Sequence, residues 1–134
     1  MTPTFGFFFR TEKSMDFQQN ELLAECSDGV LRITLNRPKA RNALTFGMYQ
    51  RISELCQRVG TQLDDQGVKA IVISGAGDKA FAAGTDIGQF TSFETLQDGH
   101  DYEAQIETVI SSIETCRVPV IAALHGAVTG GGLV

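Results

Sequence analysis

Strand-like apolar runs alternate with helix-like patterns along this chain of 134 residues, and this alternation constrains its fold more than any other feature. The runs at 29–35, 68–74 and 118–124 are rich in β-branched and other apolar residues. Between them, apolar residues recur at steps of three and four over 45–59 and about 102–116, which is the spacing of amphipathic helices. Strands that alternate with helices favour the α/β class.

Local signals refine these expectations. Thr45 is a good N-cap for the first helix, and Gly60 follows its last apolar residue. The run at 68–74 is almost continuously apolar, which predicts a strand buried on both faces. The second helix should bury a stripe of four residues, Ile106, Val109, Ile110 and Ile113. A strand, a loop and a short helix are expected after Ile73 and again after Leu124, so the chain has a weak repeat of about fifty residues.

Composition limits the domain count and the partners. A length of 134 residues with 43% apolar residues fits one domain with an ordinary core. The net charge of -5, without a long run of Lys or Arg, argues against a nucleic-acid partner. No run approaches the roughly 18 apolar residues of a membrane span, so no membrane partner is expected.

The cysteines and acidic residues indicate neither disulfides nor a metal. Cys26, Cys56 and Cys116 are odd in number and far apart, which fits a reducing compartment. The acidic residues at 64–65 and 98–101 lack the pattern of a calcium loop. Residues 1–20 form an N-terminal extension without a clear pattern. The cytoplasm is the expected location, and the mitochondrial matrix stays open because this extension mixes basic and acidic residues.

Two glycine-containing segments, 81–87 and 125–132, each follow a strand-like run and lead toward an expected helix. Backbone N–H groups at such turns can bind an anion or a developing oxyanion. The N–H groups of Thr85 and Gly131 are the candidate donors, and the loss of one such donor costs about 3 kcal/mol of transition-state stabilisation. On spacing alone, an ordinary turn at Gly84 and a tight packing contact at the triple glycine fit equally well.

Three ordered motifs, at 36–44, 79–87 and 121–133, closely resemble the crotonase family of enoyl-CoA hydratases and isomerases. The resemblance implies an α/β fold built as a spiral of ββα units. It also implies that 21–134 is the N-terminal part of a longer domain, truncated before its C-terminal half. The expected substrate is an acyl-CoA thioester, whose CoA makes a separate cofactor unnecessary, and the longer parent is expected to form a homo-oligomer, either a trimer or a hexamer.

The resemblance also implies roles for particular residues. Thr85 and Gly131 match the two oxyanion donors of the family, which hold the oxygen of a thioester enolate. Six further residues match the positions that bind the substrate: Arg41, Ala43, Ala83, Asp86, Ile87 and Gly130.

One position departs from the family pattern. Typical hydratases carry a catalytic Glu two positions after the third glycine, where this chain has Val134, and their second Glu would lie beyond the last residue. Valine cannot move a proton, which favours isomerisation or another enolate reaction over hydration. Two alternatives stay open: a non-catalytic fragment that binds acyl-CoA or pairs with other subunits, and a phosphate-binding module cradled by the triple glycine.

Three other polar residues have ordinary structural explanations. Asp86 is expected to be a charge partner in the first turn of a helix, rather than a general base. His125 is expected to be a hydrogen-bonded structural residue beside the glycine turn, and His100 to lie solvated in a polar loop.

Overall fold

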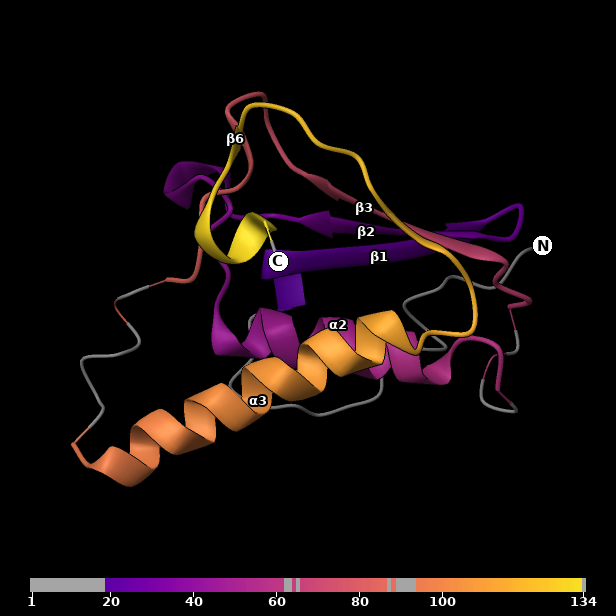
Figure 1. Ribbon diagram of the computed structural model, residues 1–134. Coiled ribbons are helices and arrows are strands. Elements are labelled where there is room, and N and C mark those ends of the chain that lie inside the picture. The colour runs from indigo at the N-terminus through magenta and orange to yellow at the C-terminus, as the bar shows by residue number, and fades with distance from the viewer. Residues whose placement is uncertain (1–18, 62–63, 65, 87, 89–93, 134) are drawn as a thin grey trace.

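The computed structural model describes residues 19–61, 64, 66–86, 88 and 94–133 (Figure 1). Its main sheet has four strands in the order β1-β2-β3-β5. Their bounds are Leu22–Ser27, Val30–Leu35, Ala70–Gly75 and Val120–Ala122. β1 is antiparallel to β2, whereas β2, β3 and β5 are parallel to one another. The predicted α/β class is therefore confirmed.

Two helices cover one face of this sheet, as Figure 1 shows. They are α2, Phe46–Arg58, and α3, Leu96–Glu114. A second sheet pairs β4, Ala80–Ala82, in parallel with β6, Ala127–Val128. Short 3-10 helices complete the described elements: η1 at Gln19–Glu21, η2 at Pro38–Ala40 and η4 at Gly130–Leu133.

The repeat expected from the sequence is present in the topology. Each strand of one unit lies beside its counterpart in the next, since Ile71 pairs with Val120 and Ala80 pairs with Ala127. Each β3-like strand is followed by a β4-like strand and then by a helical segment. This is the ββα unit that the resemblance implies.

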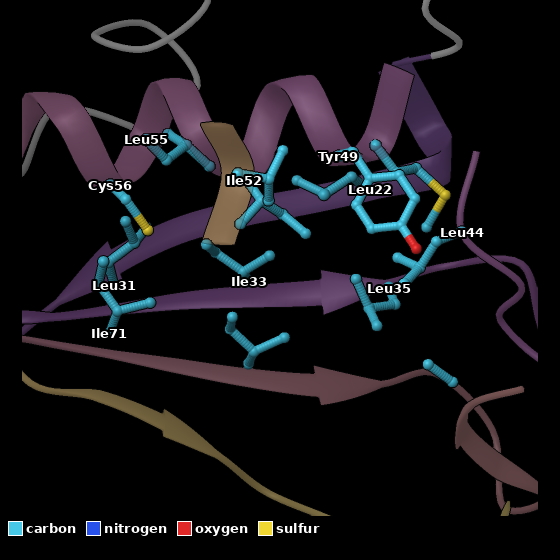
Figure 2. Close-up of a cluster of buried hydrophobic side chains, with 14 of the residues drawn as sticks. Leu22, Leu31, Ile33, Leu35, Leu44, Tyr49, Ile52, Leu55, Cys56 and Ile71 are labelled. Carbon is cyan, nitrogen blue, oxygen red and sulfur yellow. The ribbon is translucent and has the colours of Figure 1, made fainter. Parts of the chain in front are cut away.

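The core lies between α2 and the facing side of the sheet (Figure 2). Leu31, Ile33 and Leu35 point to this side from alternate positions of β2, and they meet Ile52 and Leu55 from α2. All five are at most 5% exposed. This apolar contact fixes the register of the sheet, because a slip of one residue would turn every core side chain outward.

The prediction that the strand at 68–74, which corresponds to β3, is buried on both faces is wrong. Ile71 and Ile73 are buried against the helices, but Ala70 and Val72 are partly exposed. Both described helices lie on the other side of the sheet, so within the described residues this face has no helical cover.

The first helix is confirmed, and the second is longer than predicted. Thr45 caps α2, with its hydroxyl accepting the Met48 N–H at 3.1 Å. α3 begins at Leu96 rather than near residue 102, because Thr95 and Asp98 form a capping box. Hydrogen bonds from the backbone N–H groups of Glu94 and Thr95 lower the pKa of the Asp98 carboxyl.

Two expectations about α3 need correction. His100 is exposed, as predicted, but it belongs to the helix and not to a loop. In the predicted stripe only Val109 is buried, and Ile106, Ile110 and Ile113 are partly exposed.

The strand β1 was not predicted. It pairs with β2 through a two-residue turn at Asp28 and Gly29, where both φ angles are positive, at 54° and 79°. Asp-Gly is a strong signal for this turn, but the run that precedes it is short and mixes polar with apolar residues, so it does not stand out as a strand. The expected extension, 1–20, lies almost entirely outside the described residues.

The cysteines are free thiols in the structure. Burial raises the pKa of the Cys56 thiol to about 12, with a further contribution from the neighbouring Cys116. Among the described helices, none is long and apolar enough to span a bilayer.

Candidate functional site

The motifs at 36–44 and 79–87 lie side by side and pair through backbone hydrogen bonds. The Ala83 N–H donates to the Arg41 carbonyl at 3.0 Å, and the Leu44 N–H donates to the Gly84 carbonyl at 2.8 Å. The Asp86 N–H then donates to the Leu44 carbonyl at 2.9 Å. These three bonds bring four of the predicted substrate-binding residues, Arg41, Ala43, Ala83 and Asp86, onto adjoining strands of backbone.

The third motif joins them through the small sheet. The β4–β6 pairing continues past β6, where the Thr129 N–H donates to the Ala82 carbonyl at 3.1 Å. At the next residue, a Cβ on Gly130 would lie 3.2 Å from the Gly84 Cα. The two glycine segments, far apart in sequence, are therefore in van der Waals contact.

Two of the three consecutive glycines have no room for a side chain or adopt a backbone that favours glycine. Gly130 has a φ of +53°, which favours glycine, and a Cβ on Gly132 would collide with the carbonyl oxygen of Ala82. The packing contact that the sequence left open as an alternative is thus real.

The backbone geometry leaves the two candidate donors outside the local hydrogen bonds. Thr85 forms a parallel bridge with Leu44, and in such a bridge the bonds come from the residues on either side of Thr85. The Thr85 N–H therefore points away from Leu44. In η4 the first hydrogen bond of the turn runs from the Gly132 N–H to the Thr129 carbonyl at 2.8 Å. The Gly131 N–H comes before this first bonded N–H, in the part of a helix where N–H groups have no partner within the helix.

The sequence placed a helix start at Thr85, and the structure shows extended backbone there instead. Helical backbone appears at Gly88, whose N–H donates to the Asp86 Oδ1 at 3.0 Å, as at a helix start that a carboxylate caps. The predicted substrate-binding residue Ile87 lies outside the described residues, as does Val134.

Asn42 is the buried polar centre of the motif at 36–44. It is 1% exposed and has a φ of +57°, a conformation that Asn adopts more readily than most residues. Its Oδ1 accepts the Arg37 N–H at 2.8 Å, while its Nδ2 donates to the carbonyls of Ala76 at 3.0 Å and Ala80 at 2.8 Å. This one amide fixes the first motif to the start of β4.

Arg37 links the same motif to the segment around Thr85. Its Nη2 lies 3.0 Å from an oxygen of Asp86, and its Nη1 donates to the Ala43 carbonyl at 2.8 Å. A longer contact of 3.4 Å reaches Glu21. The Arg37 side chain is 20% exposed. Its planar guanidinium contacts both of the paired segments, through the Ala43 carbonyl on one and Asp86 on the other.

We expect Arg37→Met to lower the free energy of unfolding by about 1–2 kcal/mol, because two carboxylates lose their cation and the Ala43 carbonyl loses a donor. Urea denaturation measures this change. Arg32→Met is the matched control, since Arg32 is exposed on β2 and its loss should change the free energy of unfolding by no more than about 0.5 kcal/mol. Equal losses in the two variants would contradict a special role for Arg37.

The hydroxyl groups of Tyr49 and Tyr102 both lie next to the hydroxyl of Thr85. The Tyr49 hydroxyl from α2 lies 2.6 Å from the Thr85 Oγ1, and the Tyr102 hydroxyl from α3 donates to the same oxygen at 3.4 Å. The Tyr102 ring also packs against that of Phe46 in a tilted arrangement, with ring centroids 5.3 Å apart. Burial raises the pKa of Tyr49, the Thr85 hydroxyl opposing and nearby Tyr102 adding to this effect, so the Tyr49 phenol keeps its proton.

Some of these residues had a sequence signal and others had none. Arg37 and Asn42 stand inside the recognised motif at 36–44 but had received no role. Tyr49 and Tyr102 lie on helices remote in sequence from Thr85, so no spacing rule could have found them. The His125 Nε2 lies 3.0 Å from the Gly77 carbonyl, as suits a structural residue.

Other features lie apart from this site. A shallow groove of about 460 Å³ runs along α3 and shares no lining residue with the glycine segments; Gln57, Glu107 and Ser111 are among its walls. No group of three metal-binding side chains occurs in the part of the chain that the structure describes.

Comparison with known proteins finds one family. The family model for enoyl-CoA hydratase/isomerase matches residues 25–134. The chain is 34% identical over 113 residues to a short-chain-enoyl-CoA hydratase of Clostridium acetobutylicum. It is 36% identical over 115 residues to the mitochondrial Δ(3,5)-Δ(2,4)-dienoyl-CoA isomerase of Mus musculus. The solved enoyl-CoA hydratase of Mycobacterium smegmatis matches with a TM-score of 0.74 and 33% identity.

The matches cover most of this chain and a smaller part of each relative. They include 84% of this chain and 42% of the Clostridium protein, and 78% of this chain and 34% of the mouse protein. For the Mycobacterium structure the shares are 84% and 42%. The chain therefore spans less than half the length of each of these relatives.

Proposed function

Because this chain belongs to the enoyl-CoA hydratase/isomerase family, we propose that it binds an acyl-CoA thioester and holds the thioester oxygen with the backbone N–H groups of Thr85 and Gly131. The observation that carries this proposal is the contact between Gly84 and Gly130. It joins the extended segment at Gly84 to the start of η4, and the N–H groups of the residues that follow, Thr85 and Gly131, take no part in the local backbone bonds described above.

Two such donors suit an enolate. When a proton leaves the carbon next to a thioester carbonyl, negative charge moves onto the carbonyl oxygen. Preorganised N–H groups stabilise this charge without having to reorient, and each contributes about 3 kcal/mol. The proposed hole therefore favours any reaction that passes through a thioester enolate.

The loop at 41–43 is the proposed CoA contact. Arg41 is exposed and has a left-handed backbone, with a φ of +53°, and its carbonyl is tied to the Ala83 N–H. A guanidinium in this position suits the phosphates of CoA, because Arg pairs well with phosphate oxygens. Arg37 holds the neighbouring Ala43 carbonyl and Asp86 in place.

The reaction at the acyl group is the finer part of the proposal. Val134 stands where typical hydratases of the family carry a carboxylate, so we propose isomerisation or another enolate reaction rather than hydration.

A second candidate is a chain that binds acyl-CoA without turnover and pairs with other subunits, in a trimer or hexamer. It is favoured by Val134 and by two exposed apolar residues on and just after β5, Ile121 at 50% and Leu124 at 58%.

The test is calorimetric titration of the purified chain with crotonyl-CoA and acetoacetyl-CoA, while the enoyl absorbance of crotonyl-CoA reports turnover. Circular dichroism confirms that the chain is folded, and free CoA is the matched ligand that lacks the thioester. Tighter binding of the thioesters than of free CoA is the expected result.

The outcomes separate the candidates. Turnover supports the enzyme, and saturable binding without turnover selects the non-catalytic chain. No binding by a folded chain overturns both.

A further inference from the structure

Cys56 and Cys116 are free thiols that take no part in the proposed acyl-CoA site. Cys56 lies on α2 and is 2% exposed, and Figure 2 shows it among the core side chains. Cys116 follows the end of α3, packs against the same core and is partly exposed. The two residues are far apart in the sequence, so only the packing of the two helices can bring them together.

Contacts on either side of the two cysteines show how the helices are aligned. About one turn before them, the Ser53 Oγ lies 2.7 Å from the Ser112 Oγ, and both serines are buried. After them, a Cβ on Gly60 would lie 2.9 Å from the Cβ of Arg117. The two segments therefore run in the same direction here, and the cysteines lie at facing positions between these two contacts.

The thiols themselves are in contact, since the side chain of Cys56 is hydrogen-bonded to that of Cys116. The Cys116 N–H donates to the Ile113 carbonyl at 3.3 Å, so the last turn of α3 positions this residue. A disulfide needs facing Cβ atoms about 3.5–4.5 Å apart. Cys116 lies just outside the regular helix, where the backbone can make the small adjustment that bond formation requires.

We propose that Cys56 and Cys116 form a redox-sensitive pair, which a low-molecular-weight disulfide such as oxidised glutathione converts into an intramolecular disulfide between α2 and the end of α3. This pair does not depend on acyl-CoA binding. The new bond encloses residues 57–115, which include the glycine segment at 81–87. It stabilises the fold because it restricts the unfolded chain.

The exchange takes two steps. Cys116, the more exposed thiol, attacks one sulfur of oxidised glutathione as a thiolate. A bond forms between these two sulfurs, the S–S bond of glutathione breaks, and one glutathione thiolate leaves. Cys56 then gives its proton to solvent and attacks the Cys116 sulfur, which releases the second glutathione thiolate. The protein loses two electrons, and these reduce one glutathione disulfide to two molecules of glutathione.

The order of the two steps follows from the surroundings of Cys56. Burial raises the pKa of this thiol to about 12, so at neutral pH it is protonated and does not attack first. The charge and the hydrogen bond of Cys116 add to this raised pKa. Both contributions disappear once the Cys116 sulfur is bonded to glutathione, so the second step becomes easier.

The test uses the whole chain with Cys26→Ser, which leaves the pair as its only thiols. After treatment with oxidised glutathione under native conditions, intact mass spectrometry should show the loss of two hydrogen atoms and no attached glutathione. Peptide mapping should place the bond between Cys56 and Cys116. The urea midpoint of unfolding should rise by at least about 1 M, and dithiothreitol should return it to the value of the reduced chain.

Two further variants of this chain assign the steps, and circular dichroism checks that each is folded. Cys56→Ala removes the second thiol, so the reaction should stop at a stable glutathione adduct on Cys116. Cys116→Ser removes the first attacking thiol, so the buried Cys56 should stay unmodified.

Four results would contradict the proposed pair in the chain that keeps both cysteines. They are a stable glutathione adduct, a disulfide-linked dimer, the absence of any reaction, and a lower urea midpoint after oxidation. None of these results bears on thioester binding, which is measured separately.

Discussion

Replacing Asn42 by Asp should lower the free energy of unfolding by about 3 kcal/mol or more. The substitution keeps the size of the side chain but exchanges the Nδ2 donor for an oxygen. That oxygen would face the carbonyls of Ala76 and Ala80, to which the amide now donates at 3.0 Å and 2.8 Å. A buried charge without a compensating partner costs about 3–5 kcal/mol.

The control is Asn36→Asp, the same exchange at an exposed hydrogen bond. The Asn36 Nδ2 donates to the Asn20 carbonyl at 2.7 Å near the surface, where water can replace the donor, so we expect a loss of about 1 kcal/mol or less. Urea denaturation at neutral pH measures both. Similar losses in the two variants would show that the buried amide has no special importance.

Acid should reduce the loss in Asn42→Asp. The protonated acid can donate to one carbonyl, so the pKa of this group in the folded state should rise above its unfolded value of about 3.9. A group with a raised pKa has its stabilising form fully present below the unfolded pKa and loses it as the pH rises through the folded pKa. The difference from wild type should therefore be smallest below about pH 4.

Gly132→Ala should weaken acyl-CoA binding by at least about tenfold and lower the free energy of unfolding by about 1–3 kcal/mol. The new Cβ would collide with the carbonyl oxygen of Ala82, which is backbone and cannot turn aside. η4 would then move away from β4, and the Gly131 N–H would leave the site. A misplaced oxyanion donor loses much of the roughly 3 kcal/mol that it contributes.

Gly99→Ala provides the comparison. A Cβ on Gly99 would meet nothing within 4 Å, and the residue lies inside α3. Alanine there should raise the free energy of unfolding by about 0.5–1 kcal/mol and leave thioester affinity unchanged. Calorimetry and urea denaturation of both variants give the result. Wild-type affinity in Gly132→Ala would mean that the contact between η4 and β4 does not shape the site.

The sequence predicts well those elements whose signals are local. The alternating residues of β2 and the Thr45 cap of α2 appear in the structure as expected, because period and capping chemistry are properties of a few neighbouring residues. The order of the three motifs was sufficient to identify the family.

Features that depend on distant parts of the chain were harder to predict. The one-sided burial of β3 depends on which face the helices cover, and an apolar run carries no information about this. The early start of α3 is a local feature, set by the capping pair Thr95 and Asp98, but the turns that follow this pair are polar and carry no apolar stripe to mark a helix.

The candidate site shows the same difference between local signals and contacts made by distant residues. Glycine spacing indicated which backbone segments matter, but the contact between Gly84 and Gly130 follows from the pairing of β4 with β6. Asp86 was expected to serve a helix start, and it accepts the Gly88 N–H there, but its ion pair with Arg37 carried no signal in the sequence. Side-chain partners of this kind become visible only when the chain is folded.

The most direct test of the proposed site is to follow the backbone amide signals of Thr85 and Gly131 by NMR during a titration with acetoacetyl-CoA. If these two N–H groups hold the thioester oxygen, both signals should move together and saturate at the ligand concentration that saturates the calorimetric binding. The Gly99 amide, on the exposed part of α3, should stay in place. Saturable binding that leaves the Thr85 and Gly131 signals unmoved would contradict the account.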